Sequence, residues 1–185
     1  MNSKTSILKV SKAQNTDSYY VKILGVRDVK GENISKLIPK LRELSSLVKV
    51  QAIQSDIVFG LDHLMRVIEI TLELWNRGIR ISRSIETDLL MRLCCTDQIS
   101  KAIAVGGLKK WQPGCLILIS QDLNSILEVE MSIRQNFAYP CMSVLRPGKK
   151  KMEILQMKYG FRTKKMDRKY FENSLVERAA LVELI

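Results

Sequence analysis

One stretch of the chain, residues 61–77, carries apolar side chains on two sides of a helix, and this limits the folds that the sequence can adopt. Leu64 and Ile68 recur at helical spacing and belong to one apolar stripe, whereas Val67 and Leu74 belong to a second stripe on nearly the opposite side. A helix with two apolar sides is stable in water only where both sides are covered. We therefore expect neighbours on both sides, supplied by the same domain or by a partner protein.

Short apolar and alternating segments predict a sheet beside this helix. Residues 115–119 are entirely apolar, which is typical of a strand at the centre of a sheet, and residues 48–53 alternate with period two. Further strands are expected at residues 19–26, 141–145 and 180–184. Further helices are expected from about residue 33, where Pro39 interrupts or restarts the helix, at about 84–94, 97–106, 122–135 and 152–159, and from about 167. Because strands and helices do not alternate strictly, the sequence predicts an α/β (α+β) fold. We expect a single domain over residues 1–185, with a central mixed or antiparallel sheet flanked by helices.

The positive charge of the chain is concentrated near its C-terminal end. The 185 residues include 30 Lys and Arg against 19 Asp and Glu, a net charge of +11. Residues 146–169 hold ten basic and two acidic residues, a net charge of +8. Tyr159 and Phe161 lie in this basic segment, and rings among basic residues suit RNA, because rings stack on bases while cations contact phosphates. The charge favours a polyanionic partner, although a solvated surface segment has the same composition.

The chain lacks the motifs of the common enzyme classes. It has no glycine-rich phosphate loop and no nucleophile elbow, and its one histidine, His63, excludes a two-histidine metalloprotease motif. We expect His63 to be a buried histidine with one hydrogen bond. Cys94, Cys95, Cys115 and Cys141 follow no metal-binding spacing and are expected to be reduced thiols. The sequence thus predicts a binding protein without metal or cofactor. One alternative is a small thiol-dependent enzyme that uses Cys94 or Cys95.

No segment approaches the roughly 18 apolar residues of a membrane-spanning helix, and residues 1–14 lack the apolar core of a secretory signal. We therefore expect a cytoplasmic protein that has neither a membrane partner nor a small-molecule substrate.

Three blocks of the chain resemble, in the same order, the motifs of one known family. Residues 88–93 (Asp-Leu-Leu-Met-Arg-Leu), residues 97–103 (Asp-Gln-Ile-Ser-Lys-Ala-Ile) and Gly107 are similar to its signature. Residues 177–184 (Glu-Arg-Ala-Ala-Leu-Val-Glu-Leu) resemble its C-terminal motif, and residues 63–68 resemble one of its helices. This family, the PRPK-binding protein family, is the small subunit of the KEOPS (EKC) complex that binds the atypical kinase of that complex.

The resemblance implies a non-catalytic subunit of the machinery that makes threonylcarbamoyl-adenosine in tRNA. Such a subunit is a single α/β domain that binds the kinase subunit and the single-stranded 3′ CCA end of tRNA. Cys95 and Asp97 stand where the family has glycine and arginine, which removes one candidate RNA contact. The resemblance does not indicate which surface contacts the kinase. A general basic RNA-binding accessory protein outside KEOPS is the main alternative.

The expected tRNA contacts come from the signature and from charge. Two of them have a structural alternative: Arg92 follows Asp88 by four residues and can pair with it along one helix, and Gln98 can form a hydrogen bond at a helix N-terminus. The signature indicates Arg83, Arg92, Gln98 and Lys101, and the charge adds Lys109, Lys110, Lys149, Lys150 and Lys151.

Overall fold

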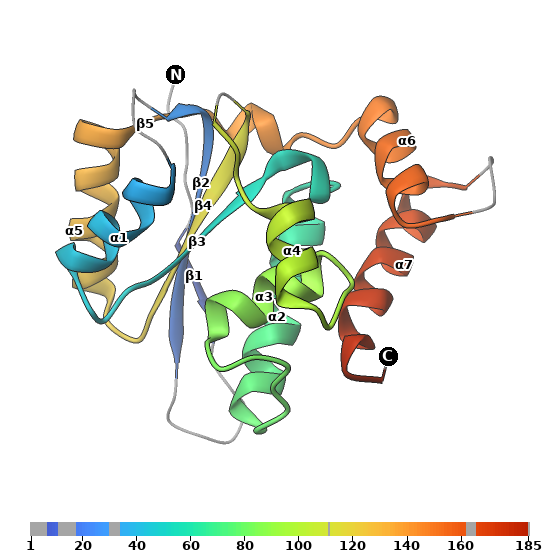
Figure 1. Ribbon diagram of the computed structural model, residues 1–185, viewed down its shortest axis with the longest axis horizontal. Helices are drawn as coiled ribbons and strands as arrows, with labels where there is room; N and C mark the ends of the chain where they lie inside the picture. Colours follow the sequence, from blue (N-terminus) through green and yellow to red (C-terminus); the bar gives the residue numbers. More distant parts are fainter. Residues whose placement is uncertain (1–6, 11–17, 30–33, 111, 162–165, 185) are drawn as a thin grey trace. The chain divides into compact units, whose positions relative to one another are not determined.

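The computed structural model of the chain describes residues 7–10, 18–29, 34–110, 112–161 and 166–184 (Figure 1). The chain forms two compact units, and each is assembled from two separate stretches of sequence. The first, called here the sheet unit, comprises Met1–Gln54 and Leu108–Val144; the second, called here the helical unit, comprises Ser55–Gly107 and Leu145–Ile185. That residues 1–185 fold as a single domain stays a prediction.

The sheet unit contains an antiparallel sheet with the strand order β1-β2-β4-β3, and β5 pairs with β2. At its centre, Leu116 lies opposite Leu24 of β2 and Ala52 of β3. Every residue of β4 is buried, as the apolar run at residues 115–119 predicts for a central strand. The strands are β1 (Ile7–Val10), β2 (Tyr19–Val29), β3 (Lys49–Gln54), β4 (Gly114–Ser120) and β5 (Ala138–Pro140).

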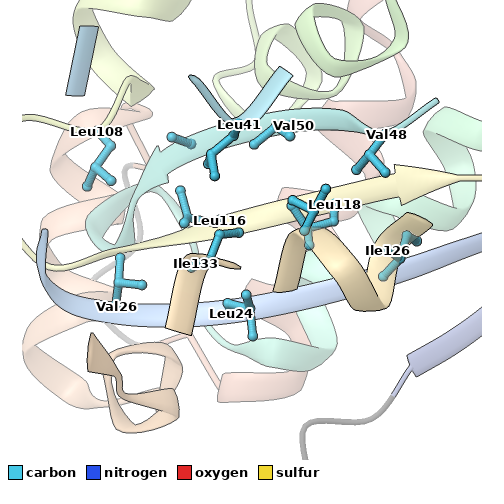
Figure 2. Packing of buried hydrophobic residues seen from close by; sticks show 12 residues of the cluster. Leu24, Val26, Leu41, Val48, Val50, Leu108, Leu116, Leu118, Ile126 and Ile133 are labelled. Carbon is cyan, nitrogen blue, oxygen red and sulfur yellow. The ribbon is translucent and has the colours of Figure 1, made fainter. Parts of the chain in front are cut away.

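Two helices pack on one face of this sheet, α1 (Ile34–Leu44) against β3 and α5 (Leu123–Ser132) against β2 and β4. Figure 2 shows Leu24 and Leu118 of the strands beside Ile126 of α5 in a shared apolar core. Because side chains of a strand alternate between faces, alternate residues of β2, β3 and β4 enter this core, namely Leu24, Val26, Val50, Ala52, Leu116 and Leu118. The α+β fold class, with an antiparallel sheet flanked by helices, is confirmed.

The helical unit is built around α2, which contacts both α3 and α7. Leu64 and Ile68 of one predicted stripe and Val67 of the other are buried, as the two stripes predict. A second, smaller core contains Phe59 and Phe171, whose rings meet edge to face with their centres 5.3 Å apart. The helices are α2 (Leu61–Asn76), α3 (Ile85–Leu93), α4 (Ile99–Gly106), α6 (Lys149–Lys158) and α7 (Arg168–Ala180).

Two of the expected strands are wrong. Residues 141–145 and 180–184 contain short 3₁₀ helices, Met142–Leu145 and Val182–Leu184, and the preceding residues Ala138–Pro140 form β5 instead. The reason is that an apolar run of four or five residues is compatible with either an extended or a tightly wound backbone. The strand β1 is an addition to the predicted elements, and α6 begins three residues earlier than predicted.

Candidate nucleic-acid interface

An open hollow on the surface of the helical unit contains two exposed arginines. It has a volume of about 660 Å³ and is formed by the loop between α2 and α3, the first turn of α3 and the start of α4. Cations beside hydroxyl groups are typical of surfaces that contact the phosphates and sugars of nucleic acids. The hollow is lined by Arg80, Ile81, Ser82, Arg83, Ser84, Thr87 and Ile99.

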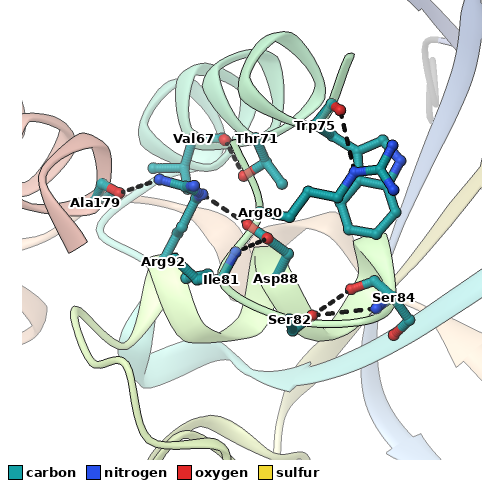
Figure 3. Close-up of polar contacts among 10 residues, drawn as sticks. All are labelled: Val67, Thr71, Trp75, Arg80, Ile81, Ser82, Ser84, Asp88, Arg92 and Ala179. Carbon is teal, nitrogen blue, oxygen red and sulfur yellow. Dashed lines mark hydrogen bonds and ion pairs between the residues drawn. The ribbon is translucent and has the colours of Figure 1, made fainter. Parts of the chain in front are cut away.

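Arg80 is held against the end of α2 (Figure 3). The helix α2 ends at Asn76, and the chain turns back at Gly78, whose φ of +78° is the left-handed conformation that glycine adopts without strain. The Cζ atom of Arg80 then lies 4.3 Å from the centre of the Trp75 indole ring, and its Nε donates to the Trp75 carbonyl oxygen at 3.4 Å. This cation–π contact restricts the guanidinium and makes a flat surface on which a base can stack.

Hydroxyl groups organise the loop before α3. Ser82 Oγ donates to the carbonyl oxygen of Ser84 at 2.7 Å, and Ser84 Oγ donates to Thr87 Oγ1 at 2.9 Å. Ser84 occupies the N-cap position of α3, but its side chain makes no capping hydrogen bond to the backbone. The N-terminus of a helix carries a partial positive charge, and the first turn of α3 also holds the acidic residues Glu86 and Asp88, which suit that end of the helix.

Arg92, which the signature indicates as a tRNA contact, has no exposed surface. Its Nε donates to Asp88 Oδ1 at 2.7 Å, and its Nη1 donates to the carbonyl oxygen of Ala179 on α7 at 3.3 Å (Figure 3). The alternative of an ion pair along its own helix is therefore confirmed. Because a fully buried guanidinium cannot reach a phosphate in solution, Arg92 is removed from the candidate RNA contacts.

Of the other residues that the signature indicates, Arg83 lines the hollow, whereas Gln98 and Lys101 stand on either side of Ile99 in the sequence. Gln98 is the N-cap residue of α4 and Lys101 lies in its first turn; both are exposed, and Gln98 makes no capping hydrogen bond with its side chain. Neither lines the hollow, but Ile99 between them does. At Gly106, a Cβ atom would collide with the Cys94 Sγ, so glycine permits the close packing of α4 against the end of α3.

The lysines predicted from charge are divided between the two units. Lys109 and Lys110 are exposed and belong to the sheet unit, whereas the residues that line the hollow belong to the helical unit. Lys149 and Lys150 are exposed in the first turn of α6, whereas Lys151 is half-buried. Arg162, Lys164 and Lys165 of the basic segment lie outside the described residues.

The two rings of the basic segment, Tyr159 and Phe161, are half-buried and pack against the small core, and their interpretation as base-stacking rings stays a prediction. The hydroxyl of Tyr159 donates to the carbonyl oxygen of Leu93 at 2.9 Å, and burial raises the pKa of Tyr159 well above its usual range. Phe161 packs on Phe171 with ring centres 5.1 Å apart. Trp75 is likewise half-buried, and Tyr170 on α7 is 60% exposed. The sequence signal for Trp75 is its position five residues before Arg80, across a helix-ending glycine.

The residues considered for catalysis are poorly suited to it. Burial raises the pKa of the Cys94 thiol to about 12 and that of Cys95 to about 11, so neither holds an appreciable thiolate at neutral pH. His63 is buried, as expected, and its Nδ1 accepts the N–H of Phe59 at 3.3 Å. Burial, with the nearby charges of Arg66 and Lys151, lowers the pKa of His63 to about 3.

Within the described residues, no three His, Cys, Asp or Glu side chains come together in a way that could hold a metal ion. In the same part of the chain, none of the helices has the length and apolar character needed to cross a bilayer.

The comparisons with known proteins do not add a family. Neither a protein-family model nor a curated protein matches the chain. The resemblance to the KEOPS subunit, and the tRNA and kinase partners that it implies, therefore stay predictions. The hollow around Arg80 and Arg83 is the candidate site that the fold itself provides.

Proposed function

We propose that the chain is a non-catalytic, cytoplasmic tRNA-binding subunit of the KEOPS (EKC) complex, in which it binds the atypical kinase and captures the 3′ CCA end of tRNA. The observation that carries the proposal is the hollow, where two exposed guanidinium groups lie beside hydroxyls and an aliphatic side chain. The net charge of +11 and the resemblance of residues 88–107 to the family signature support it further.

A single-stranded RNA end offers the groups that this hollow can bind. Arg80 and Arg83 supply cations for phosphates, and the hydroxyls of Ser82 and Thr87 can contact ribose 2′-hydroxyls. The pair formed by Trp75 and Arg80 supplies a flat surface for an unstacked base. A duplex stem presents phosphates but no unstacked bases, so the hollow should favour the CCA end over the duplex stems of the tRNA.

The main alternative is a general RNA-binding protein outside KEOPS. The observation that favours it is the exposure of Lys149 and Lys150 on α6, because lysines on a helix surface contact phosphates without regard to sequence. A thiol-dependent enzyme is not proposed, since the raised pKa values of Cys94 and Cys95 leave almost no thiolate at neutral pH.

The test compares binding of one tRNA with and without its 3′ CCA end, at two salt concentrations. We expect removal of the CCA end to weaken binding at least tenfold. Arg83→Ala should weaken binding of the intact tRNA about 10- to 100-fold, as expected for one charged hydrogen bond of about 1.5–3 kcal/mol. The matched control is Arg77→Ala, since Arg77 is an exposed arginine outside the hollow that pairs with Glu73 at 3.6 Å.

Equal affinity for the intact and trimmed tRNA, unchanged by Arg83→Ala, would contradict capture of the CCA end and favour the general RNA-binding alternative. The kinase partner needs its own measurement. We expect a stable complex with the KEOPS kinase subunit in analytical ultracentrifugation, and separate sedimentation of the two proteins would contradict the KEOPS assignment.

A further inference from the structure

Three consecutive polar contacts connect the loop of the hollow to the interior of the helical unit (Figure 3). The N–H of Ile81 donates to Asp88 Oδ2 at 2.8 Å. The other carboxylate oxygen, Asp88 Oδ1, accepts Arg92 Nε at 2.7 Å, and Arg92 Nη1 donates to the carbonyl oxygen of Ala179 at 3.3 Å. The side chains of Asp88 and Arg92 are 1% and 0% exposed. This series of contacts, called here the loop anchor, joins the loop to α3 and α7.

Each end of the loop anchor satisfies a backbone group that its own secondary structure leaves open. Ile81 lies between α2 and α3, so its N–H has no place in either helix. Ala179 lies in the last turn of α7, where carbonyl oxygens have no partner within the helix and a cation is favoured. Asp88 and Arg92 therefore do more than neutralise each other, because they fix the main chain at two separate points.

The fixed point at Ile81 adjoins the two arginines of the hollow. Arg80 precedes it directly and Arg83 follows it by two residues, and Ile81 itself lines the hollow. A loop that is already ordered loses less conformational entropy when a ligand binds than a loop that must become ordered. The position of Asp88 Oδ2 therefore bears on how well Arg80 and Arg83 are prepared for an anionic ligand.

We propose that Asp88 and Arg92 are positioning residues, which hold the main chain at Ile81 so that Arg80 and Arg83 stand ready at the hollow before the ligand binds. The loop anchor should order the loop around Ile81 whatever the ligand is. The effect of this ordering on binding rests on the proposed function, in which the ligand is the 3′ end of tRNA. In this arrangement the buried Arg92 acts on RNA binding only through Asp88, without touching RNA itself.

The test follows the amide hydrogen exchange of Ile81 and the affinity for intact tRNA in three variants. Asp88→Asn removes the negative charge that pairs with Arg92, and Arg92→Met removes the guanidinium. Arg92→Lys is the conservative variant that keeps a cation beside Asp88. The matched control is Leu175→Ala, which disturbs the buried core of the same unit without touching the loop anchor. All proteins are measured well below their unfolding temperatures.

We expect Asp88→Asn and Arg92→Met to speed exchange of the Ile81 amide at least tenfold and to weaken tRNA binding at least fivefold. Arg92→Lys should change both the Ile81 exchange rate and the tRNA affinity less than Arg92→Met does. Leu175→Ala should lower the unfolding temperature but change neither quantity appreciably. A purely structural ion pair would instead affect stability in the same way as Leu175→Ala and leave the Ile81 amide unchanged.

Two outcomes would overturn the inference. The first is an Ile81 exchange rate in Asp88→Asn equal to that in Leu175→Ala, and the second is faster Ile81 exchange without weaker tRNA binding. If the variants do not fold, the wild-type protein decides, because an Ile81 amide that exchanges as fast as in an unstructured peptide contradicts the loop anchor. Absence of tRNA binding by the wild-type protein would overturn the proposed function, and the exchange of Ile81 would still report on the loop anchor.

Discussion

Arg83 and Arg92 lie nine residues apart, and the structure gives the two guanidinium groups opposite surroundings. Arg83 is exposed in the hollow, whereas Arg92 is buried between Asp88 and the carbonyl oxygen of Ala179. An exposed cation can exchange its water for a phosphate, but a buried one is stable only with fixed partners, and breaking the pair leaves an uncompensated charge. Burial, rather than residue type, thus separates the arginine that is open to a ligand from the arginine that holds neighbouring parts of the chain together.

His63 provides a prediction at the same scale. Its pKa is about 3 in the folded chain against an ordinary value of 6.5, because burial disfavours the charged imidazolium. Below pH 6.5 the unfolded chain therefore takes up a proton that the folded chain refuses, and stability falls as the pH drops from 6.5 towards 3. At pH 5 the loss should be about 2 kcal/mol relative to pH 7.5. Urea denaturation at the two pH values measures it.

The control for this prediction is His63→Gln, which keeps an acceptor for the N–H of Phe59 but does not titrate. Groups elsewhere in the chain titrate alike in both proteins, so the difference between them isolates His63. The same pH dependence in the wild-type protein and the variant would show that the imidazole is not shielded from protonation.

At the scale of elements, α6 begins with a feature that works against its own stability. Lys149 and Lys150 lie in the first turn, where the helix carries a partial positive charge, and Gly148 at the N-cap offers no side-chain cap. No acidic residue occurs in that turn. The start of the basic segment is thus a helix N-terminus whose lysines are repelled by the helix dipole and are available to an anion.

We expect Lys149→Glu with Lys150→Glu to stabilise the protein and to weaken RNA binding at the same time. Each reversal should raise the free energy of unfolding by about 0.3–1 kcal/mol at low salt, because a carboxylate suits the helix N-terminus. If these lysines bind phosphates, the slope of log affinity for tRNA against log salt should flatten by about 0.7–0.9 for each phosphate that the variant no longer binds. Chemical denaturation and binding titrations at several salt concentrations measure the two effects.

A variant with reversed charge elsewhere provides the comparison for this element. Lys40→Glu changes the net charge of the chain by the same amount per residue but lies on α1, away from any helix N-terminus. An unchanged salt dependence after Lys149→Glu and Lys150→Glu would exclude α6 from the RNA-binding surface and leave the hollow as the candidate.

At the scale of the whole molecule, the sheet unit depends on a strand that arrives late in the chain. The central strand β4 pairs with β2 on one side and β3 on the other, and it begins at Gly114, after Ser55–Gly107 of the helical unit. Without β4, neither β2 nor β3 has its main partner, because they do not pair with each other. The helical unit is divided in the same manner, since α2 packs on α7 from the end of the chain.

A fragment of residues 1–107 should therefore fail to fold, although it contains β1, β2 and β3. An isolated pair of strands is marginal at best in water, and the apolar side chains that β4 covers would be exposed. For the fragment 1–107 we expect no cooperative thermal transition by circular dichroism. The longer fragment 1–144 is the comparison, because it retains every described strand of the sheet. A cooperative transition in the fragment 1–107 would contradict this dependence on β4.

The local patterns of the sequence determined much of the fold by themselves. The two apolar stripes of residues 61–77 predicted a helix covered on both sides, because the spacing of apolar residues reflects the backbone period. The apolar run at residues 115–119 was typical of a central strand, and the structure confirms the strand β4 there. The i, i+4 spacing of Asp88 and Arg92 predicted their ion pair as one of two alternatives. The short apolar runs at residues 141–145 and 180–184 did not have enough periods to distinguish a strand from a 3₁₀ helix.

Only the tertiary structure decided which cations are available. Arg92 is buried, and Ala179, 87 residues away in the sequence, supplies its second hydrogen-bond acceptor. A local sequence pattern cannot predict a contact between residues so far apart in the chain. Arg80 joins Arg83 at the hollow because the turn at Gly78 returns the chain to Trp75 and because α4 brings Ile99 alongside. Backbone periodicity is a local property and is written in the sequence, whereas burial of a charge depends on partners that only folding brings within hydrogen-bond distance.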